Sequence, residues 1–299
     1  MNNIKSQFSI KDLENLTGIK AHTIRIWEKR YGLLEPSRTE TNIRFYDLKN
    51  FQKLLNVSYL NQNGYKISKI ANLPEENIPV LVKEISMQSD SKEHVLNSFK
   101  MSMLNFDQTL FYKTYNSISE ELNFSEIFKD YFIPLLKEIG LLWQTNTITP
   151  SHEHFISGLI RQKIGIHTEI LQSKANISSS KTFVLFLPEH EVHELGLLYL
   201  NYELIAHKHH SIFLGQSVPL NSLSDVIDFY DNITFISYFT VMPQIDDIND
   251  YLKEFESKII TDKKHEFWIL GRRIESIDLE QLPKSISTFE SIEALVKKL

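Results

Sequence analysis

The last third of the chain alternates short apolar runs with helical patterns, and this alternation limits the folds that it can adopt. Five runs have the length of buried strands, at 183–187, 211–214, 233–238, 267–270 and 285–289. Amphipathic stretches lie between and after them, at 192–206, 221–230, 246–257, 277–281 and 291–298. Strands that alternate with helices pair in parallel, because each crossover carries a helix. We therefore expect a doubly wound, Rossmann-like α/β domain at 179–299, with its ligand at the carboxyl ends of the strands.

A histidine lies where the first of these strands should end. The segment Glu191-Val-His193-Glu-Leu-Gly196 follows the apolar run and opens the first helical stretch. A carboxylate near a histidine can hold one ring nitrogen and orient the other toward a metal ion. The chain has no cysteine, which excludes disulfides and thiolate metal sites. We therefore predict that His193 is a metal ligand and that Glu191 orients it.

The same segment resembles the D-x-H-x-x-G motif of cobalamin-binding domains, in which the histidine binds cobalt from the lower face. Glu191 here replaces the aspartate, and Gly196 is the motif's glycine. The resemblance implies that Ser217, after the second strand, and Gly271, after the fourth, lie near the cofactor's nucleotide tail. Two features depart from the family: Pro219 replaces a leucine, and an arginine pair follows Gly271 where many members have Gly-Gly.

The first 73 residues have the pattern of a DNA-binding head. They hold twelve Lys/Arg and six Asp/Glu, a net charge of +6, whereas the whole chain carries −6. Ser9 and Asp12 are spaced nearly as a capping box for a first helix, and a second helix is expected from about Ala21 to Arg30, ending before Gly32. Two short helices around a glycine-containing turn are typical of a helix-turn-helix, whose second helix enters the major groove.

A turn-rich segment after Pro36 predicts a two-stranded wing. The segment TIRIWEKRYGLLEP, followed by RFY, resembles the MerR family of transcription regulators. The resemblance implies that helices at 47–63 and 66–71 complete the winged domain. The resemblance implies a double-stranded DNA operator as partner. We assign to the major groove His22, Thr23 and Arg25, and to the DNA backbone Arg38, Arg44 and Tyr46. Solvated surface charge is the alternative for each arginine, and their occurrence together on helix and wing favours DNA.

The middle of the chain predicts a four-helix bundle with connections over 77–178, after a boundary at 73–76. Its helical stretches lie at 77–89, 92–104, 107–122, 125–141 and 150–174. Taken singly, Trp143 would be a packing residue, and Glu153 and His154 would be polar residues of a first helical turn. Their W-x9-E-H spacing resembles that of MerR-type cobalamin photoreceptors, the CarH-like regulators. The resemblance implies that Trp143 packs beside an adenosyl group and that Glu153 and His154 line the same upper pocket.

The residue after this tryptophan differs from that of some light-sensing members. There a histidine can take the upper cobalt position after photolysis, and here the residue is Gln144. A carboxamide is a poor cobalt ligand compared with imidazole. Capture of the upper face after light would then need another residue, such as His152 or His154, or would not occur.

Together these features predict a multidomain protein of α and α/β parts: a winged helix-turn-helix head, a four-helix bundle and a Rossmann-like domain. We expect a homo-oligomeric transcriptional repressor, dimer or tetramer, controlled by adenosylcobalamin and by light. Two alternatives stay open. One is a regulator of the same fold that has lost cobalamin and binds a protein partner. The other is the corrinoid carrier module of an enzyme.

Features of catalysis and of membrane insertion are not visible in the sequence. It shows no nucleophile–base pair with family spacing and no phosphate-binding glycine loop, so we do not expect an enzyme. No apolar run reaches the roughly 18 residues that a membrane span requires, and no secretory leader is visible. We therefore expect a cytoplasmic protein without a membrane partner.

Overall fold

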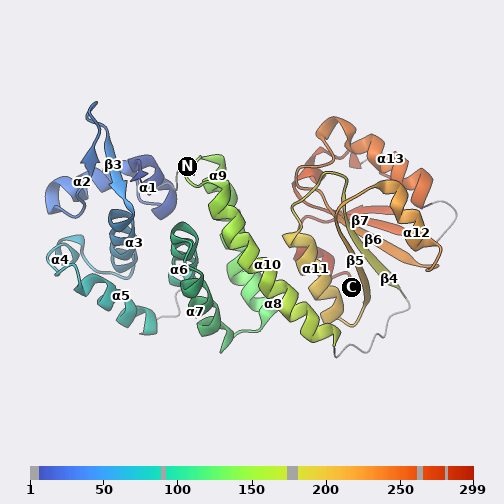
Figure 1. The fold of residues 1–299 in the computed structure, drawn as a ribbon, viewed down its shortest axis with the longest axis horizontal. Helices are drawn as coiled ribbons and strands as arrows, with labels where there is room; N and C mark the ends of the chain where they lie inside the picture. Colours follow the sequence, from blue (N-terminus) through green and yellow to red (C-terminus); the bar gives the residue numbers. More distant parts are fainter. Residues whose placement is uncertain (1–6, 89–91, 174–180, 261–264, 280–281) are drawn as a thin grey trace. The chain divides into compact units, whose positions relative to one another are not determined.

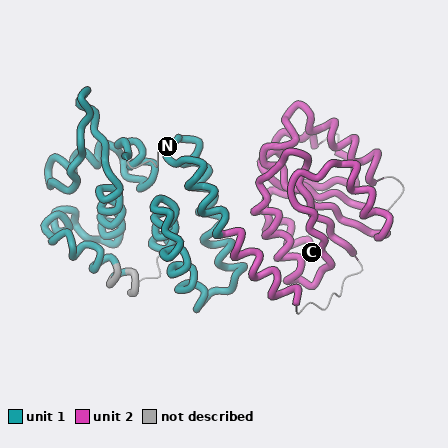
Figure 2. Tube along the Cα trace, in the orientation of Figure 1, with its two compact units in different colours: residues 1–159 teal, residues 160–299 magenta. Residues whose placement is uncertain are grey.

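The computed structural model describes residues 7–88, 92–173, 181–260, 265–279 and 282–299 (Figure 1). It divides into two compact units, residues 1–159 and residues 160–299, coloured teal and magenta in Figure 2. Below, these are the first and the second unit. Among the described residues, no helix combines the length and the apolar character needed to cross a membrane.

The head of the first unit is a winged helix-turn-helix. Its helices are α1 (Ile10–Thr17) and α2 (Ala21–Tyr31), and its antiparallel sheet has the order β1 (Gln7–Phe8), β3 (Arg44–Asp47), β2 (Ser37–Arg38). The predicted capping box is confirmed, because the Ser9 hydroxyl accepts from the Asp12 N–H and the Asp12 carboxylate accepts from the Ser9 N–H. Gly32 ends α2 with φ 61°, a left-handed conformation that glycine adopts readily.

Three further helices follow the wing: α3 (Leu48–Gln62), α4 (Ile67–Ile70) and α5 (Asn77–Gln88). The first two confirm the predicted helices of the winged domain. Ile78 and Val82 of α5 belong to the same buried cluster as Val57 and Leu60 of α3. The helix that follows Pro74 therefore packs against the head, across the boundary that the sequence suggested.

The predicted helical bundle forms the rest of the first unit and extends into the second through its last helix. Its elements are α6 (Lys92–Asn105), α7 (Gln108–Ser119), α8 (Phe124–Ile127), the π-helical turn η1 (Phe128–Phe132), α9 (Ile133–Gln144) and α10 (Pro150–Gln172). Phe99, Phe111 and Phe132 are fully buried, and their ring centroids lie 5.2–6.2 Å apart. Aromatic packing of this kind holds the helices together.

The second unit is an open parallel sheet with helices. Its strands have the order β5 (His210–Val218), β4 (Thr182–Pro188), β6 (Ile233–Tyr238), β7 (Glu266–Leu270), β8 (Ile286–Thr288). Its α-helices are α11 (Leu195–Ala206), α12 (Ser224–Ile227), α13 (Ile248–Ile259) and α14 (Ile292–Val296), and its short 3-10 turns are η2 (Leu220–Leu223), η3 (Ile245–Asp247) and η4 (Arg272–Ser276). All five predicted strands and the doubly wound fold are confirmed.

One predicted helix of this unit is wrong. The helical turn after β7 is η4, not 277–281, and Ile277 has extended backbone with its side chain buried in the sheet's core. Residues 280–281 lie outside the described residues. The apolar side chain is held inside by tertiary packing, which overrides the local helical pattern.

The strand order places a topological switch point between β4 and β6. Both strands pair in parallel along their buried length, from Thr182 beside Ile233 to Phe186 beside Ser237. Their carboxyl ends therefore release two loops side by side, at 189–194 and 239–243. In doubly wound sheets this is where ligands bind.

Candidate functional site

Glu191 ties these two loops together. Its Oε1 accepts hydrogen bonds from the N–H groups of Val192 (2.9 Å) and His193 (3.0 Å) and from His193 Nδ1 (2.5 Å). Its Oε2 accepts from the N–H groups of Val241 (2.6 Å) and Met242 (2.8 Å) in the neighbouring loop. The carboxylate is fully buried, so these bonds replace its lost hydration.

The same contacts keep Glu191 ionised. Burial by itself would raise the pKa of this carboxyl, but the hydrogen bonds from His193 and from the backbone of Met242 and Val241 outweigh it and lower the pKa to about 2. A buried carboxylate that stays charged near neutral pH can accept from Nδ1 of its histidine. It thereby selects the tautomer in which that nitrogen carries the proton.

The imidazole of His193 is presented at the edge of the sheet. Its side chain is 52% exposed, although the carboxylate that holds it is fully buried. Since Nδ1 is bound to Glu191, Nε2 lies on the side of the ring that points away from that carboxylate. This is the geometry of a metal-ligating histidine with its orienting partner. The extra methylene of glutamate, compared with the aspartate of the family motif, is compatible with it.

The two predicted glycines serve close packing around this edge. A Cβ on Gly196, in the first turn of α11, would lie 2.8 Å from the ring of Tyr238. Gly271 has φ 105°, and a Cβ there would lie 2.3 Å from the carbonyl oxygen of Phe239. A side chain at either position would displace a neighbour, so both glycines let the site's loops approach the sheet.

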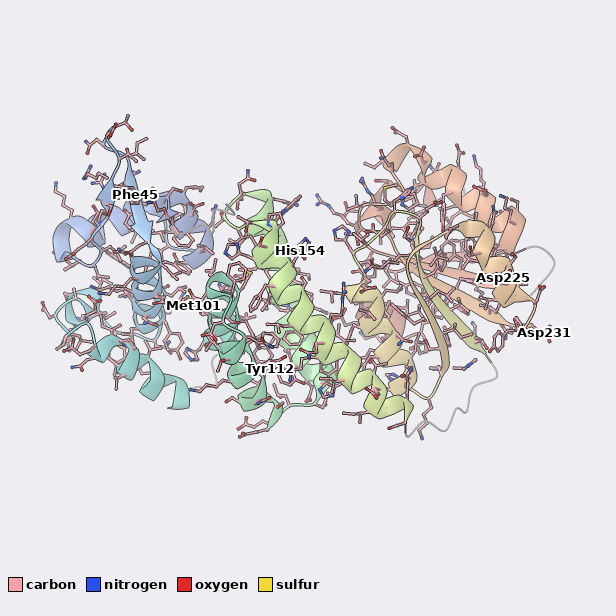
Figure 3. The ribbon with its side chains drawn as sticks, viewed as in Figure 1. Phe45, Met101, Tyr112, His154, Asp225 and Asp231 are labelled. Atoms are coloured by element: carbon pink, nitrogen blue, oxygen red, sulfur yellow. The ribbon has the colours of Figure 1, made fainter. Side chains whose placement is uncertain are left out.

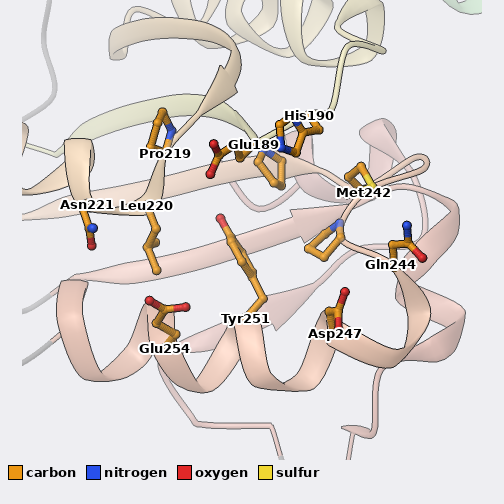
Figure 4. A pocket seen from close by; sticks show the side chains of 12 residues that line it. Glu189, His190, Pro219, Leu220, Asn221, Met242, Gln244, Asp247, Tyr251 and Glu254 are labelled. Atoms are coloured by element: carbon orange, nitrogen blue, oxygen red, sulfur yellow. The ribbon is translucent and has the colours of Figure 1, made fainter.

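Ser217, at the end of β5, is hydrogen-bonded to the loop at 189–194 that carries His193. Its hydroxyl accepts from the N–H of His190 (3.0 Å), and its own N–H donates to the carbonyl of Glu191 (3.2 Å). Neither Ser217 nor Gly271 lines the adjacent pocket, whereas Pro219, two residues after the serine, does (Figure 4). The assignment of Ser217 and Gly271 to a nucleotide tail stays a prediction.

This donor set fits a corrinoid. In the described ranges, no group of three or more His, Asp or Glu side chains is placed to hold a metal ion. His193 can supply one ligand, and the remaining ligands would have to come with the metal. A corrin would bring nitrogen ligands of its own for cobalt, and His193 would supply one further ligand from the protein.

The residues expected at the upper face lie at the junction of α9 and α10 in the first unit. Trp143, in the last turn of α9, is 54% exposed. Glu153 and His154 lie in the first turn of α10, where His154 Nδ1 is 2.8 Å from Glu153 Oε2 and the Ser157 hydroxyl donates to Glu153 Oε1 at 2.9 Å. His154, labelled on α10 in Figure 3, has a side chain that is 78% exposed. The structure thus brings all three to the same helix junction, and their place in an upper pocket stays a prediction.

His152 is unsuited to the upper-ligand role suggested for it. Its side chain is buried, its ring stacks on Phe106 at 4.7 Å, and its Nδ1 lies 2.8 Å from the Thr149 hydroxyl. That suggestion is wrong, because the apolar face of α10 carries this histidine into the core of the bundle.

The DNA-binding assignments in the head divide into two groups. His22 and Arg25 are exposed on α2, and the Thr23 hydroxyl lies 3.3 Å from His22 Nε2. Arg38 is exposed on the wing, where its Nη1 donates to Asn42 Oδ1 at 2.7 Å. These four side chains are accessible to DNA, and their contacts stay predictions.

Arg44 and Tyr46 are instead held by a glutamate of α2. Glu28 Oε1 accepts from Arg44 Nε at 2.9 Å, and Glu28 Oε2 accepts from the Tyr46 hydroxyl at 2.9 Å. Tyr46 is fully buried, so its assignment to the DNA backbone is wrong: the hydroxyl is used inside the head. Glu28 is only 13% exposed, because it joins α2 to β3.

Several residues of the site gave no sign of their role in the sequence. The N–H groups of residues 240–242 that hold Glu191 belong to the backbone and have no side-chain signature. Arg273 Nε donates to the Val241 carbonyl at 3.2 Å and so supports the same loop. Tyr251 has the spacing of a core residue on α13, and only the structure places it in a pocket.

Comparisons with known proteins match two families to separate parts of the chain. The family described as MerR HTH family regulatory protein matches residues 8–76, and the B12 binding domain family matches residues 95–167. Two Myxococcus xanthus proteins are similar: the HTH-type transcriptional repressor CarH, 27% identical over 74% of this chain and 74% of its own length, and the HTH-type transcriptional repressor CarA, 24% identical over 72% and 70%.

A solved structure shares the fold. The monomethylamine corrinoid protein of Methanosarcina barkeri superposes with a TM-score of 0.56 and 11% identity, over 70% of this chain and 98% of that one. The chain therefore joins a MerR-type helix-turn-helix head to a B12-binding region, and it is homologous to the transcriptional repressors CarH and CarA.

Proposed function

We propose that this protein is a DNA-binding transcriptional repressor controlled by cobalamin, with His193 as the lower ligand of cobalt. The observation that carries this proposal is the Glu191–His193 pair at the switch point. A fully buried carboxylate holds Nδ1 of an exposed imidazole, in a chain whose described part has no other metal-ligand cluster.

The head supplies the contact with the operator. Its net charge of +6 contrasts with the acidic remainder of the chain, and α2 exposes His22 and Arg25. A basic helix-turn-helix is steered to DNA by phosphate attraction and reads bases in the major groove. The repressor names of the two Myxococcus relatives support repression as the output.

We further propose that the adenosyl form is the physiological ligand and that light controls it. When bound, adenosylcobalamin supplies a cobalt–carbon bond that visible light cleaves. On the protein side, Trp143 offers an exposed indole against which an adenosyl group can pack, and Glu153 and His154 offer polar contacts beside it. Because Gln144 follows Trp143 where a histidine can occur, we expect no strong imidazole ligand on the upper face at that position.

One helix offers a route from ligand binding to assembly. α10 begins at Pro150 and carries Glu153 and His154 near its start. Further along it lies Arg161, whose Nη2 is 3.0 Å from Oε1 of Glu194, the neighbour of His193. Glu194 is nearly buried, so this ion pair links the loop that carries His193 to the part of α10 in the second unit. We propose that cofactor binding fixes this helix and thereby favours a dimer or tetramer that presents several heads to a palindromic operator.

A corrinoid carrier module is the second candidate. The likeness to a monomethylamine corrinoid protein favours it, because that protein has this fold over most of its length. A carrier has no need of a basic winged head. Regulation is therefore the better account of the whole chain.

The test starts from cofactor-free protein in the dark. We expect added adenosylcobalamin to co-purify with the protein, to increase its mass in size-exclusion chromatography and to strengthen its binding to operator DNA, with green light reversing the last two effects. His193→Ala should lose the colour and the mass change together.

His207→Ala is the matched control, since His207 is a half-exposed histidine at the C-terminal end of α11, away from the carboxyl edge of the sheet. Cofactor binding without any change of mass or DNA affinity would favour the carrier. Absence of binding would refute the cobalamin proposal and direct attention to a protein partner of the α/β unit.

A further inference from the structure

The head and the helical bundle are in contact within the first unit. The ring of Tyr59, in α3, packs against the ring of His94, in α6, with 5.2 Å between their centroids. Asn15, in α1, donates a hydrogen bond from Nδ2 to the hydroxyl oxygen of Thr147 at 3.2 Å, across 132 positions of the sequence. Thr147 is fully buried in the turn between α9 and α10. The first helix of the head is therefore joined to the turn that follows Trp143.

The hydrogen-bonded groups continue from Thr147 into the last turn of α9. Thr147 Oγ1 lies 2.9 Å from Thr145 Oγ1. Thr145 Oγ1 lies 3.0 Å from the carbonyl oxygen of Leu141 and 3.1 Å from that of Leu142. A carbonyl oxygen only accepts, so the Thr145 hydroxyl donates its single proton there and accepts from Thr147, whose oxygen accepts from Asn15. We call this series, from the Asn15 amide to the end of α9, the head–turn chain.

The end of the head–turn chain is fixed to Trp143 by the backbone. The N–H of Asn146 donates to the Trp143 carbonyl at 3.0 Å. The N–H of Thr147 donates to the Leu142 carbonyl at 2.9 Å. The turn and the end of α9 therefore form one hydrogen-bonded segment, which carries the exposed indole of Trp143. A ligand that packs on this indole restricts the motion of the segment, and with it the motion of the acceptors in the head–turn chain.

The buried hydroxyl of Thr147 makes the contact sensitive to small displacements. Valine has the same shape, so packing alone does not require a hydroxyl at this position. Hydrogen bonds in series strengthen one another, and a break anywhere removes one bond and weakens the next. The contact is therefore a two-state element, with the head either docked on the turn through the whole chain or released from it.

We propose that the head–turn chain couples two binding events, so that a ligand on Trp143 and DNA on the head strengthen each other's binding. A ligand on the indole holds the acceptors of the chain in place and favours the docked head. A docked head has already lost part of its freedom and loses less of it on binding DNA. The effect is reciprocal by thermodynamic linkage. This inference rests on the proposed function and adds a route within one protein chain, separate from oligomer formation.

The test measures the affinity of full-length protein for adenosylcobalamin in the dark, by absorbance, with and without saturating DNA. The DNA is a duplex selected by wild type from a random-sequence pool. We expect DNA to tighten adenosylcobalamin binding to wild type. This ratio of affinities should fall about 3- to 10-fold in Thr147→Val and in Asn15→Ala, which break the chain at its buried hydroxyl and at its first donor.

Ser102→Ala is the matched control. It removes another buried hydroxyl of the first unit, which donates to the Asp107 carbonyl at 2.7 Å and is not part of the head–turn chain. This variant should keep the wild-type ratio of affinities. A fall as large as that of Thr147→Val would overturn the inference, because it would show a general effect of lost stability.

Hydrogen exchange provides a readout that does not depend on affinity. Adding adenosylcobalamin should slow the exchange of the α1 amides in wild type and in Ser102→Ala, and should leave it unchanged in Thr147→Val and Asn15→Ala. The mass increase with cofactor should persist in all four proteins, and its loss in the two chain variants would overturn the inference by showing that the contact serves assembly.

Two results with wild type separate the inference from the proposed function. If wild type bound both ligands independently, or if its ratio of affinities equalled those of Thr147→Val and Asn15→Ala, the inference alone would be overturned. If wild type bound no cobalamin, the proposed function would fail first, and the inference with it.

Discussion

Two glutamates, Glu28 in the head and Glu191 in the α/β unit, organise the two candidate functional surfaces in different ways. Glu191 is fully buried and is held by backbone N–H groups from two loops and by one imidazole. Glu28 is slightly exposed and is held by two side chains of the wing strand, Arg44 and Tyr46. Each joins segments that lie far apart in the sequence.

The difference shows what each surface requires. Backbone donors cannot rotate away, so the carboxylate of Glu191 is rigid and presents the imidazole of His193 in one orientation, as a metal ligand requires. Arg44 is a long, partly exposed side chain that can exchange Glu28 for a phosphate, at the cost of an ion pair worth up to about 1 kcal/mol. We infer that the α/β site is preorganised, whereas part of the wing becomes available only when DNA competes for it.

Loss of the two carboxylates should separate the surfaces most clearly. Glu191→Ala leaves the N–H groups of Val241, Met242 and His193 without their acceptor, and we expect it to lower the free energy of unfolding of the second unit by about 3–5 kcal/mol. Glu28→Ala should cost the first unit about 1–3 kcal/mol. Urea titration followed by hydrogen exchange in each unit measures both values. Equal losses of unfolding free energy would show that the backbone N–H donors around Glu191 add no stability beyond that of side-chain partners.

Acid should act on the α/β unit through Glu191. Its pKa is lowered from 4.5 to about 2, so this carboxylate contributes stability above pH 4.5 and loses it as the pH falls toward 2. The loss amounts to at most about 3 kcal/mol, at 1.36 kcal/mol for each pKa unit. Urea midpoints between pH 2 and 6 should fall less steeply in Glu191→Gln than in wild type. Parallel pH profiles would show that other carboxyls dominate the acid response.

Operator binding should distinguish Arg25, which has no ion pair among the described residues, from Arg44, which is paired with Glu28. Arg25→Ala should weaken it by about 1–3 kcal/mol if Arg25 reads a base. Arg44→Ala should have a smaller effect, under about 1 kcal/mol, because its guanidinium is already bound to Glu28. Titration of labelled operator against each variant provides the comparison, with Lys69→Ala, which changes an exposed lysine of α4, as a control. An Arg44 effect as large as that of Arg25 would mean that its pairing with Glu28 does not restrain it.

Tyr46→Phe should have the smallest effect and should be confined to stability. The change removes one hydrogen bond to Glu28 and lowers the free energy of unfolding of the first unit by about 1 kcal/mol. Because the side chain is fully buried, operator affinity and its salt dependence should match wild type. A reduced salt slope in the variant would restore Tyr46 as a phosphate contact.

The part of the candidate site that could be predicted from the sequence consists of residues that lie close together in a short motif. Glu191, His193 and Gly196 lie within six residues, directly after a strand whose apolar run is visible, so their place at the sheet edge followed from the alternation alone. The prediction for Tyr46 was wrong because side chains along β3 point alternately to its two faces. The sequence does not say which face of a four-residue strand is turned inward.

By itself, the sequence determined the helix limits at Ser9 and Gly32, the five strands and the identity of the candidate cobalt ligand. Helix caps, left-handed glycines and hydrophobic periodicity depend on residues a few positions apart, so they can be recognised in one sequence. The tertiary structure alone decided which groups hold the two glutamates, and it left the Tyr251 hydroxyl buried in a pocket. Glu28 meets Tyr46 across 18 positions and Glu191 meets Met242 across 51, and only the packing of separate elements brings such partners together.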